Sequence, residues 1–120
     1  MKQISVLIIE DSVYSADLNI REIRKAGFIV EHRRVASEKA MLQALHESPW
    51  DIIVSDNSMP NFSALQALDI RNSMNGSIPF IIVSEDIAEE DVNRAFKNGC
   101  CAYIAKENLP ELRKLVKNML

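Results

Sequence analysis

The chain has little of several features that mark whole classes of protein. Its apolar runs are far shorter than the roughly 20 residues that a membrane-spanning helix needs. The start, Met1-Lys2-Gln3, leads straight into a strand-like run without the parts of a signal peptide. Only two cysteines are present, and because Cys100 and Cys101 are adjacent they do not form an ordinary disulfide framework. We therefore expect a cytoplasmic protein with reduced thiols and no membrane contact.

Basic charge is also scarce. The 14 lysines and arginines are outnumbered by 17 aspartates and glutamates, which gives a formal net charge of -3, and the basic residues form no stripe along the sequence. Nucleic acid is therefore not expected as a direct partner. A length of 120 residues with 48% apolar residues is typical of one globular domain. We expect residues 1–120 to form that single domain, because repeats, linkers and low-complexity segments are absent.

Five short stretches rich in valine and isoleucine alternate with helical patterns. We predict strands over Ile4–Ile9, Ile29–Val35, Ile52–Ser55, Phe80–Ser84 and Ala102–Ala105. Three of them are continuously apolar, which is typical of central strands that are covered on both faces. The second stretch carries charged residues and is predicted to be an edge strand.

The segments between these strands carry signals for the starts and ends of helices. Ser12 and Ser37 are predicted N-caps, and Gly27 and Gly99 are predicted to end the first and fourth helices. The last two helices have a capping-box pattern at their predicted starts, Asp86 with Glu89 and Asn108 with Glu111. The apolar side chains expected to face the core from the first, third and fourth helices are Val13, Ala16, Ile20, Ile23, Ala64, Leu65, Leu68, Val92, Ala95 and Phe96.

Alternating strands and helices predict an α/β fold with a parallel sheet, right-handed crossovers and helices on both faces. For five strands we predict the doubly wound order 2-1-3-4-5. In that order strands 1 and 3 are neighbours at the topological switch point, where ligands bind at the carboxyl ends of the strands. The residues that follow these two strands are therefore expected to form the functional site.

Three acids follow those strands: Glu10 and Asp11 after the first and Asp56 after the third. Carboxylates gathered at one edge repel one another and raise one another's pKa values, so a cation is expected among them. Ser84 ends strand 4 and Lys106 follows strand 5, which should bring both to the same edge. This set of groups suits magnesium together with a phosphoryl group, because magnesium prefers oxygen ligands and a lysine can hold a phosphoryl oxygen.

With these residues in these places, the chain resembles a response-regulator receiver domain, the phospho-acceptor module of two-component signalling, which has a flavodoxin-like fold. The resemblance covers essentially the whole chain. The matching residues are Glu10-Asp11, Asp56 with Met59-Pro60, Ser84, Tyr103 and Lys106. Each match alone is weak, but together they stand in the family's order at the family's strand ends.

The resemblance implies how the phosphoryl group and the metal are bound. Asp56 accepts phosphate from the phosphohistidine of a histidine kinase or a histidine phosphotransfer protein. Asp11, Asp56 and the backbone carbonyl of Ser58 ligate Mg²⁺ directly, whereas Glu10 acts largely through water. The implied protein is a signalling switch that catalyses only its own phosphorylation and dephosphorylation.

The resemblance also implies how the phosphorylated state is read. Lys106 contacts the phosphoryl group, Ser84 shifts inward to hydrogen-bond it, and Tyr103 changes rotamer. The surface that rearranges comprises the fourth helix, the strand Ala102–Ala105 and the last helix. A downstream protein or a second copy of the chain would bind there.

Three positions depart from the family pattern. Glu107 follows Lys106 where proline with a cis bond is common, so we predict a trans bond or a strained loop. Ala64 stands where the family usually has glycine, so helix 3 is expected to begin differently. Glu85 stands where a small residue is usual, and its carboxylate could hinder the phosphodonor.

Two alternative functions follow from the same residues. Because of the three departures, the chain could be a receiver-like interaction module that signals without phosphorylation. A phosphatase with an aspartyl nucleophile would generally need a second acid two residues after Asp56, where this chain has Ser58. The chain could be a stand-alone receiver or part of a longer protein such as a hybrid histidine kinase.

Overall fold

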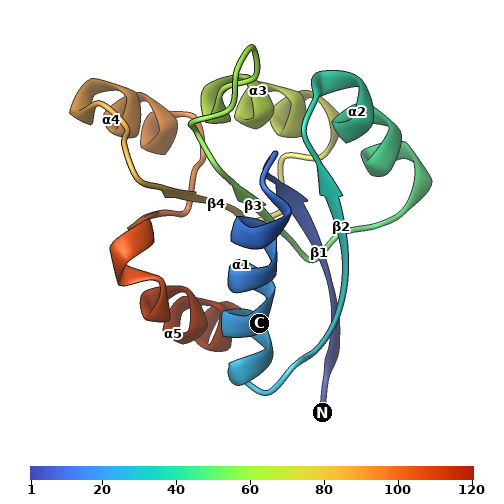
Figure 1. Ribbon diagram of the computed structural model, residues 1–120. Helices are drawn as coiled ribbons and strands as arrows, with labels where there is room; N and C mark the ends of the chain where they lie inside the picture. Colours follow the sequence, from blue (N-terminus) through green and yellow to red (C-terminus); the bar gives the residue numbers. More distant parts are fainter.

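The computed structural model, which describes residues 1–120, contains one sheet of five parallel strands in the order β2-β1-β3-β4-β5 (Figure 1). The order and the α/β class confirm the prediction, and the second strand is an edge strand as expected. The strands are β1 (Gln3–Ile9), β2 (Ile29–Val35), β3 (Ile52–Ser55), β4 (Phe80–Ser84) and β5 (Ala102–Ala105).

Five α-helices connect and follow the strands, and a 3₁₀ turn at Lys106–Asn108 lies between β5 and the last helix. The helices are α1 (Val13–Lys25), α2 (Glu38–Glu47), α3 (Ala64–Met74), α4 (Glu89–Lys97) and α5 (Pro110–Met119). None of them is long and apolar enough to cross a membrane.

Alternate side chains of the strands form two separate cores, one on each face of the sheet. Leu7, Ile9 and Ile53 belong to the core beneath α2 and α3, which also includes Ala95 of α4. Ile8 and its neighbours on the opposite face pack under α1 and α5 (Figure 1). The valine and isoleucine side chains of the strands are thus buried on both faces, and this burial stabilises the sheet. The polar residues that follow the strands lie at the carboxyl edge of the same sheet.

Most of the predicted helix boundaries are confirmed. The Ser12 and Ser37 hydroxyl oxygens accept hydrogen bonds from backbone N–H groups in the first turns of α1 and α2. Gly27 and Gly99 follow the ends of α1 and α4 with φ of +100° and +102°, the left-handed region that favours glycine. Helix α3 begins at Ala64 behind a capping box of Ser63 and Gln66.

The backbone before α3 takes its left-handed residue at Asn61, with φ of +62°. Because Asn61 supplies the positive φ of this turn, Ala64 three residues later does not need a backbone conformation that favours glycine. Asparagine tolerates this region better than most non-glycine residues do.

The two predicted capping boxes in the second half of the chain are wrong. Helix α4 begins only at Glu89, with Ala88 as an N-cap that offers no side-chain hydrogen bond. Residues Lys106–Asn108 form the 3₁₀ turn, and α5 begins at Pro110. Proline suits the first position of a helix because its missing N–H would be unpaired there, and this preference outweighs the Asn108–Glu111 pattern.

Two of the side chains predicted to face the core are exposed instead. Val13 is 57% exposed because it starts α1 above the edge of the sheet. Phe96 is 46% exposed. Helix α4 lies near the outer strand β5, where it contacts little of the sheet, and Ala95 is its one buried residue.

Arg71 of α3 is a buried charge that the sequence pattern does not reveal. Arg71 is only 4% exposed, and no carboxylate lies within salt-bridge distance of its guanidinium group. Instead it donates hydrogen bonds to the backbone oxygens of Gly76, Ile78 and Gly99. Arg71 therefore ties the loop before β4 to the turn after α4.

Replacing Arg71 by leucine should lower the free energy of unfolding by about 1–3 kcal/mol, because the buried oxygen of Ile78 would lose its donor. Urea unfolding followed by circular dichroism measures this change. Arg21→Leu on the exposed side of α1 is the matched control and should change stability by no more than about 0.5 kcal/mol. Equal effects of the two substitutions would contradict the structural role of Arg71.

Candidate functional site: a carboxylate cluster at the carboxyl edge of the sheet

The ends of β1 and β3 bring three acids together. The backbone N–H of Asp56 donates to the carbonyl of Ile9 at 2.8 Å, and that of Glu10 donates to the carbonyl of Val35 at 2.9 Å. These bonds continue the sheet by one residue beyond the strands. Glu10 and Asp56 therefore stand side by side on a rigid edge rather than on mobile loops.

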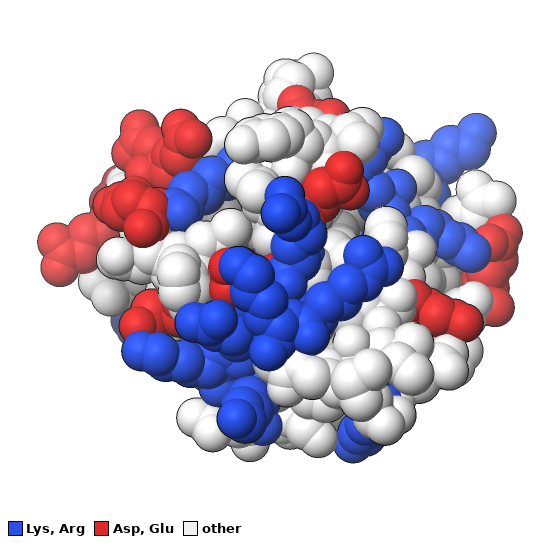
Figure 2. Space-filling view, turned by 60° about the horizontal axis from the view of Figure 1, so that its bottom comes forward, with Lys and Arg blue, Asp and Glu red and all other residues white.

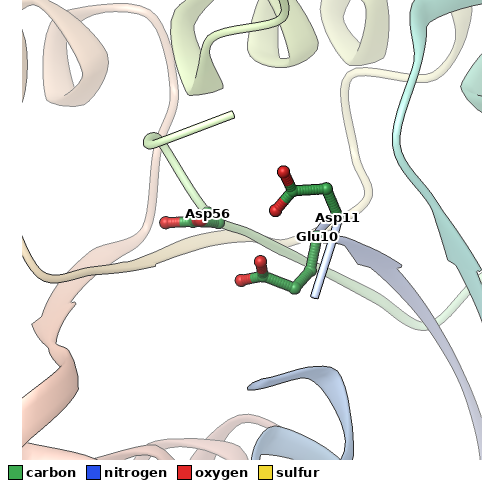
Figure 3. Close-up of side chains that lie close together, drawn as sticks. All are labelled: Glu10, Asp11 and Asp56. Carbon is green, nitrogen blue, oxygen red and sulfur yellow. The ribbon is translucent and has the colours of Figure 1, made fainter. Parts of the chain in front are cut away.

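Glu10, Asp11 and Asp56 form a triad of carboxylates. One oxygen from each lies within 4.8 Å of the others. In Figure 3 the three side chains extend from the ends of the two strands, and the carboxyl groups of Glu10 and Asp11 point toward Asp56. Glu10 and Asp56 are buried, at 2% and 5% exposure, whereas Asp11 is exposed. The triad thus has two buried carboxylates and one that is exposed to solvent.

Lys106 supplies the positive charge beside the triad. Its Nζ lies 3.4 Å from Oε2 of Glu10 and 3.7 Å from Oδ2 of Asp56. The 3₁₀ turn after β5 presents this lysine, and the chain has no cis peptide bond, so the Lys106–Glu107 bond is trans as predicted. One ammonium facing three carboxylates leaves the site with a net negative charge.

The environment of the triad changes the pKa of Glu10. Burial raises the pKa of Glu10 from its ordinary 4.5 to about 7, and the charge of Asp56 adds to this rise. The Ser12 backbone N–H, which donates to Glu10 Oε1 at 3.1 Å, and the Lys106 ammonium both oppose it. The net rise means that the fixed positive groups do not fully offset the burial of this acid.

Two polar side chains that the sequence argument did not single out hold the site in place. Asn57 donates its backbone N–H to Oδ1 of Asp56 at 2.8 Å, and its side-chain oxygen accepts the N–H of Ala64 at 3.0 Å. Arg34, from the end of β2, donates to the backbone oxygen of Glu10 at 3.2 Å. No sequence pattern distinguishes either side chain from that of an ordinary loop or edge residue, because the groups that these side chains bind, the Ala64 N–H and the Glu10 carbonyl, are backbone groups.

Ser84, Ser58 and Tyr103 lie on the β4 side of the triad. The hydroxyls of Ser84 and Ser58 are 3.3 Å apart, and Ser84 Oγ also donates to the Asp86 backbone oxygen at 3.4 Å. Tyr103 is half-buried, and its hydroxyl donates to the backbone oxygen of Ser84 at 3.4 Å. Glu85 is exposed beside them. Of the predicted site residues, the structure thus groups Glu10, Asp11, Asp56 and Lys106 in one cluster and Ser58, Ser84 and Tyr103 in a second.

This arrangement is suited to a hard divalent cation and to an anionic group. Carboxylate oxygens at these separations are the ligands that magnesium takes, and a cation would offset the repulsion among them. The ammonium group of Lys106, beside Asp56, can donate hydrogen bonds to an anionic group bound there.

Comparison with known proteins places the chain in a family. The model of the response regulator receiver domain matches residues 6–117. A two-component response regulator of rice (Oryza sativa subsp. japonica), ORR27, is 28% identical over 95% of this chain. The transcription factor SKN7 of Saccharomyces cerevisiae is 27% identical over 88% of it. The chain spans only 18% and 17% of the lengths of these two proteins.

Solved structures share the fold. The receiver domain of the sensor histidine kinase PA1611 from Pseudomonas aeruginosa PAO1 has a TM-score of 0.78 and 18% identity, and the match covers 98% of this chain and 97% of that one. Its structure has a magnesium ion coordinated in the active site cleft. The five-stranded order, the flavodoxin-like arrangement and the match over residues 6–117 agree, and the chain belongs to the response regulator receiver domain family.

Proposed function

We propose that this chain is a phosphorylatable receiver whose Asp56 accepts a phosphoryl group from a histidine kinase or a histidine phosphotransfer protein. Receiver domains act with histidine kinases in two-component signalling and are switches rather than turnover enzymes. The observation that supports this proposal most is the position of Asp56. Its carboxylate is buried within the triad, yet Lys106 Nζ lies 3.7 Å from Oδ2.

The proposed reaction is an in-line phosphoryl transfer. A carboxylate oxygen of Asp56 forms a bond to phosphorus while the phosphorus–nitrogen bond of the donor phosphohistidine breaks, and its electron pair stays on the imidazole. Lys106 offsets charge on the phosphoryl oxygens during transfer. The short bond from the Asn57 N–H to Oδ1 holds the Asp56 carboxylate in one orientation, which supports attack from the other oxygen.

Magnesium is the proposed cofactor. The carboxylates of Asp11 and Asp56 and the backbone carbonyl of Ser58 would hold it, with Glu10 acting largely through water. When bound, the ion supplies positive charge for the phosphoryl oxygens. The proposal is supported by the close triad, because a cation would offset the repulsion among its three carboxylates.

The proposed switch is the pair Ser84 and Tyr103. In this structure Ser84 Oγ is within hydrogen-bond distance of Ser58 Oγ and the Asp86 backbone oxygen. A phosphoryl group on Asp56 would offer stronger acceptors and draw the Ser84 hydroxyl toward itself. Because Tyr103 donates to the backbone of Ser84, this shift would also bias the tyrosine rotamer and the surface of α4, β5 and α5. A downstream protein or second copy would read that surface.

One observation favours the alternative of a receiver-like module that signals without phosphorylation. Glu85 is exposed and directly follows Ser84, so it adds a negative charge at the carboxyl end of β4. Its carboxylate would repel an anionic phosphodonor. The two functions differ in one measurable property, which is whether Asp56 is labelled.

A small-molecule phosphodonor such as acetyl phosphate, together with Mg²⁺, should add one phosphoryl group to the wild-type protein, measured by intact mass spectrometry. Asp56→Asn should abolish the gain, because the amide is a poor nucleophile. Asp69→Asn, which changes an exposed aspartate of α3, is the matched control and should label normally. Unchanged labelling of Asp56→Asn would refute the site, and no labelling of any form would favour the non-phosphorylated module.

Glu85→Gln should speed phosphorylation by the same donor roughly two- to fivefold, because removing one nearby surface charge is worth up to about 1 kcal/mol in water. The rate of mass gain at low ionic strength measures it, and added salt should reduce the difference. Glu89→Gln on the exposed start of α4 is the control, with a smaller effect expected. Equal rates for wild type and Glu85→Gln would show that Glu85 does not hinder the donor.

The stability of the metal-free protein should depend on Glu10. Because its folded-state pKa is about 7 against an ordinary 4.5, the folded protein binds this proton more tightly than the unfolded chain. The free energy of unfolding should therefore fall as the pH rises from about 4.5 to about 7, as urea unfolding in a chelator would show. Mg²⁺ should counteract the fall.

Glu10→Gln isolates this effect, since glutamine does not titrate and keeps the size of the side chain. The difference in unfolding free energy between this variant and wild type should grow over the same pH interval. A constant difference would contradict the assignment of the raised pKa to Glu10.

A further inference from the structure

The outer edge of β2 has no neighbouring strand. This strand is the first in the sheet and pairs with β1 on one side only. Helices α1 and α2 lie on opposite faces of the sheet (Figure 1), and the side chains of Ile29, Glu31, His32 and Arg34 are exposed. A free edge of seven residues offers a row of backbone groups with which another strand can pair.

The backbone groups on this edge come from alternate residues of β2. Those of Ile29 and Val35 bond to the β1 side of the sheet. Because the direction of bonding alternates along a strand, those of Val30, His32 and Arg34 point away from β1. No backbone group elsewhere in the chain bonds to these three residues. Their donors and acceptors are therefore free to pair with an added strand.

The sequence of β2 is self-complementary about its middle residue, His32. In an antiparallel pair of two copies with His32 on the two-fold axis, each Val30 lies opposite Arg34 of the second copy. These positions are the ones whose backbone groups point outward, so the pairs can exchange hydrogen bonds across the edge. Glu31 then lies opposite Arg33 of the second copy, with about 4.5 Å between their Cα atoms.

Charge selects this register among those that the backbone allows. Outward-facing residues must lie opposite one another, so each allowed two-fold axis passes through a residue of the strand. An axis at Glu31 or at Arg33 would place like charges opposite each other, which is destabilising. An axis at Val30 or at Arg34 would leave Glu31 and Arg33 opposite uncharged residues. Only the axis at His32 forms two ion pairs of opposite sign.

The side chains that would form these ion pairs are available. Glu31 has no basic group within 4.0 Å. Arg33 donates from Nη1 to Glu47 at 2.8 Å and lies over the Trp50 ring, 5.7 Å from its centroid, and its guanidinium has further donors. A hollow of about 380 Å³ beside Glu31 and Arg33 leaves room for the facing side chains.

The mixture of signs on the β2 edge distinguishes it from the rest of the surface. Figure 2 shows one large area of lysines and arginines near the middle of the view, and two copies that met there would repel each other. Charges of one sign on an edge strand likewise keep copies apart. Glu31 and Arg33 have opposite signs and flank His32 symmetrically, so here the charges favour pairing.

We propose that two copies of this chain associate through their β2 edges, antiparallel, with the two-fold axis at His32. The two five-stranded sheets then continue into one another. Because the paired strands run in opposite directions, the two triads lie at opposite edges of the joined sheet and both stay open. The proposal does not depend on phosphorylation at Asp56. One strand from each copy buries less than about 1,200 Å², so the dimer is expected to be reversible.

Two charge variants test the pairing, with sedimentation velocity over a range of concentrations as the measurement. Glu31→Arg and Arg33→Glu each make both ion pairs like-charged and should lower the association constant at least tenfold. An equimolar mixture of the two variants restores opposite charges at every facing position. The mixture should therefore associate within about threefold of the wild type, although neither variant does so alone.

Asp69→Arg is the matched control, because it makes the same change of net charge as Glu31→Arg at an exposed position of α3. It should associate like the wild type. A wild-type chain that stays monomeric up to about 1 mM would overturn the proposal. So would a mixture as weak as its two components, or equal weakening by Asp69→Arg.

Cysteine cross-linking tests the register, in a Cys101→Ser background that removes the exposed native thiol. Two copies of residue 32 would have Cα atoms about 5.5 Å apart, within the reach of a disulfide. Two copies of residue 34 would lie four residues out of register, more than about 13 Å apart. Under copper–phenanthroline oxidation, His32→Cys should therefore cross-link as a dimer and Arg34→Cys should not. Equal cross-linking of the two would overturn the register.

Discussion

The mutual repulsion of the carboxylates at the end of β1 and β3 is the constraint on which the rest of the structure depends. Two buried unit charges at the separation of Glu10 and Asp56 repel by about 3 kcal/mol at an effective dielectric constant of about 20. A domain of this size is stable by only about 5–15 kcal/mol. The acids are therefore held together by the remainder of the fold and not by their own contacts, and Lys106 offsets only part of the cost.

Two apolar cores on a parallel sheet provide the rigidity that this requires. The central strands β1, β3 and β4 carry isoleucine or valine on both faces, so the end of one of them cannot move away from its neighbour without exposing one of the cores. The backbone bond from Asp56 to Ile9 fixes the spacing of the inner acids. Electrostatic strain at the edge is thus maintained by hydrophobic burial beneath it, and the negative charge remains available for a cation.

The fold and the triad were predictable from the sequence because their signals are strong and local: apolar runs that end in acids, and alternation that leads to a parallel sheet. Other features depend on tertiary contacts. Arg71 looks like a surface residue of a helix until its backbone partners, up to 28 positions away, are known. The Asp86 and Asn108 capping patterns failed because a loop shaped by Ser84 and a proline at the first turn of α5 set the true starts. Asn57 likewise shows its role only through Ala64.

The two ends of helix α4 differ in how firmly they are held to the rest of the domain. Its start lacks a side-chain cap, and Ala95 is its one buried residue. At its C-terminal end, the Arg71 side chain donates a hydrogen bond to the backbone oxygen of Gly99, and the Asn72 side chain donates one to the backbone oxygen of Asn98 at 2.9 Å. A segment with so little buried surface can unfold locally at a much smaller free-energy cost than the whole domain. We therefore expect the first turn of α4 to unfold locally at a lower free-energy cost than the sheet, whose strands are buried on both faces.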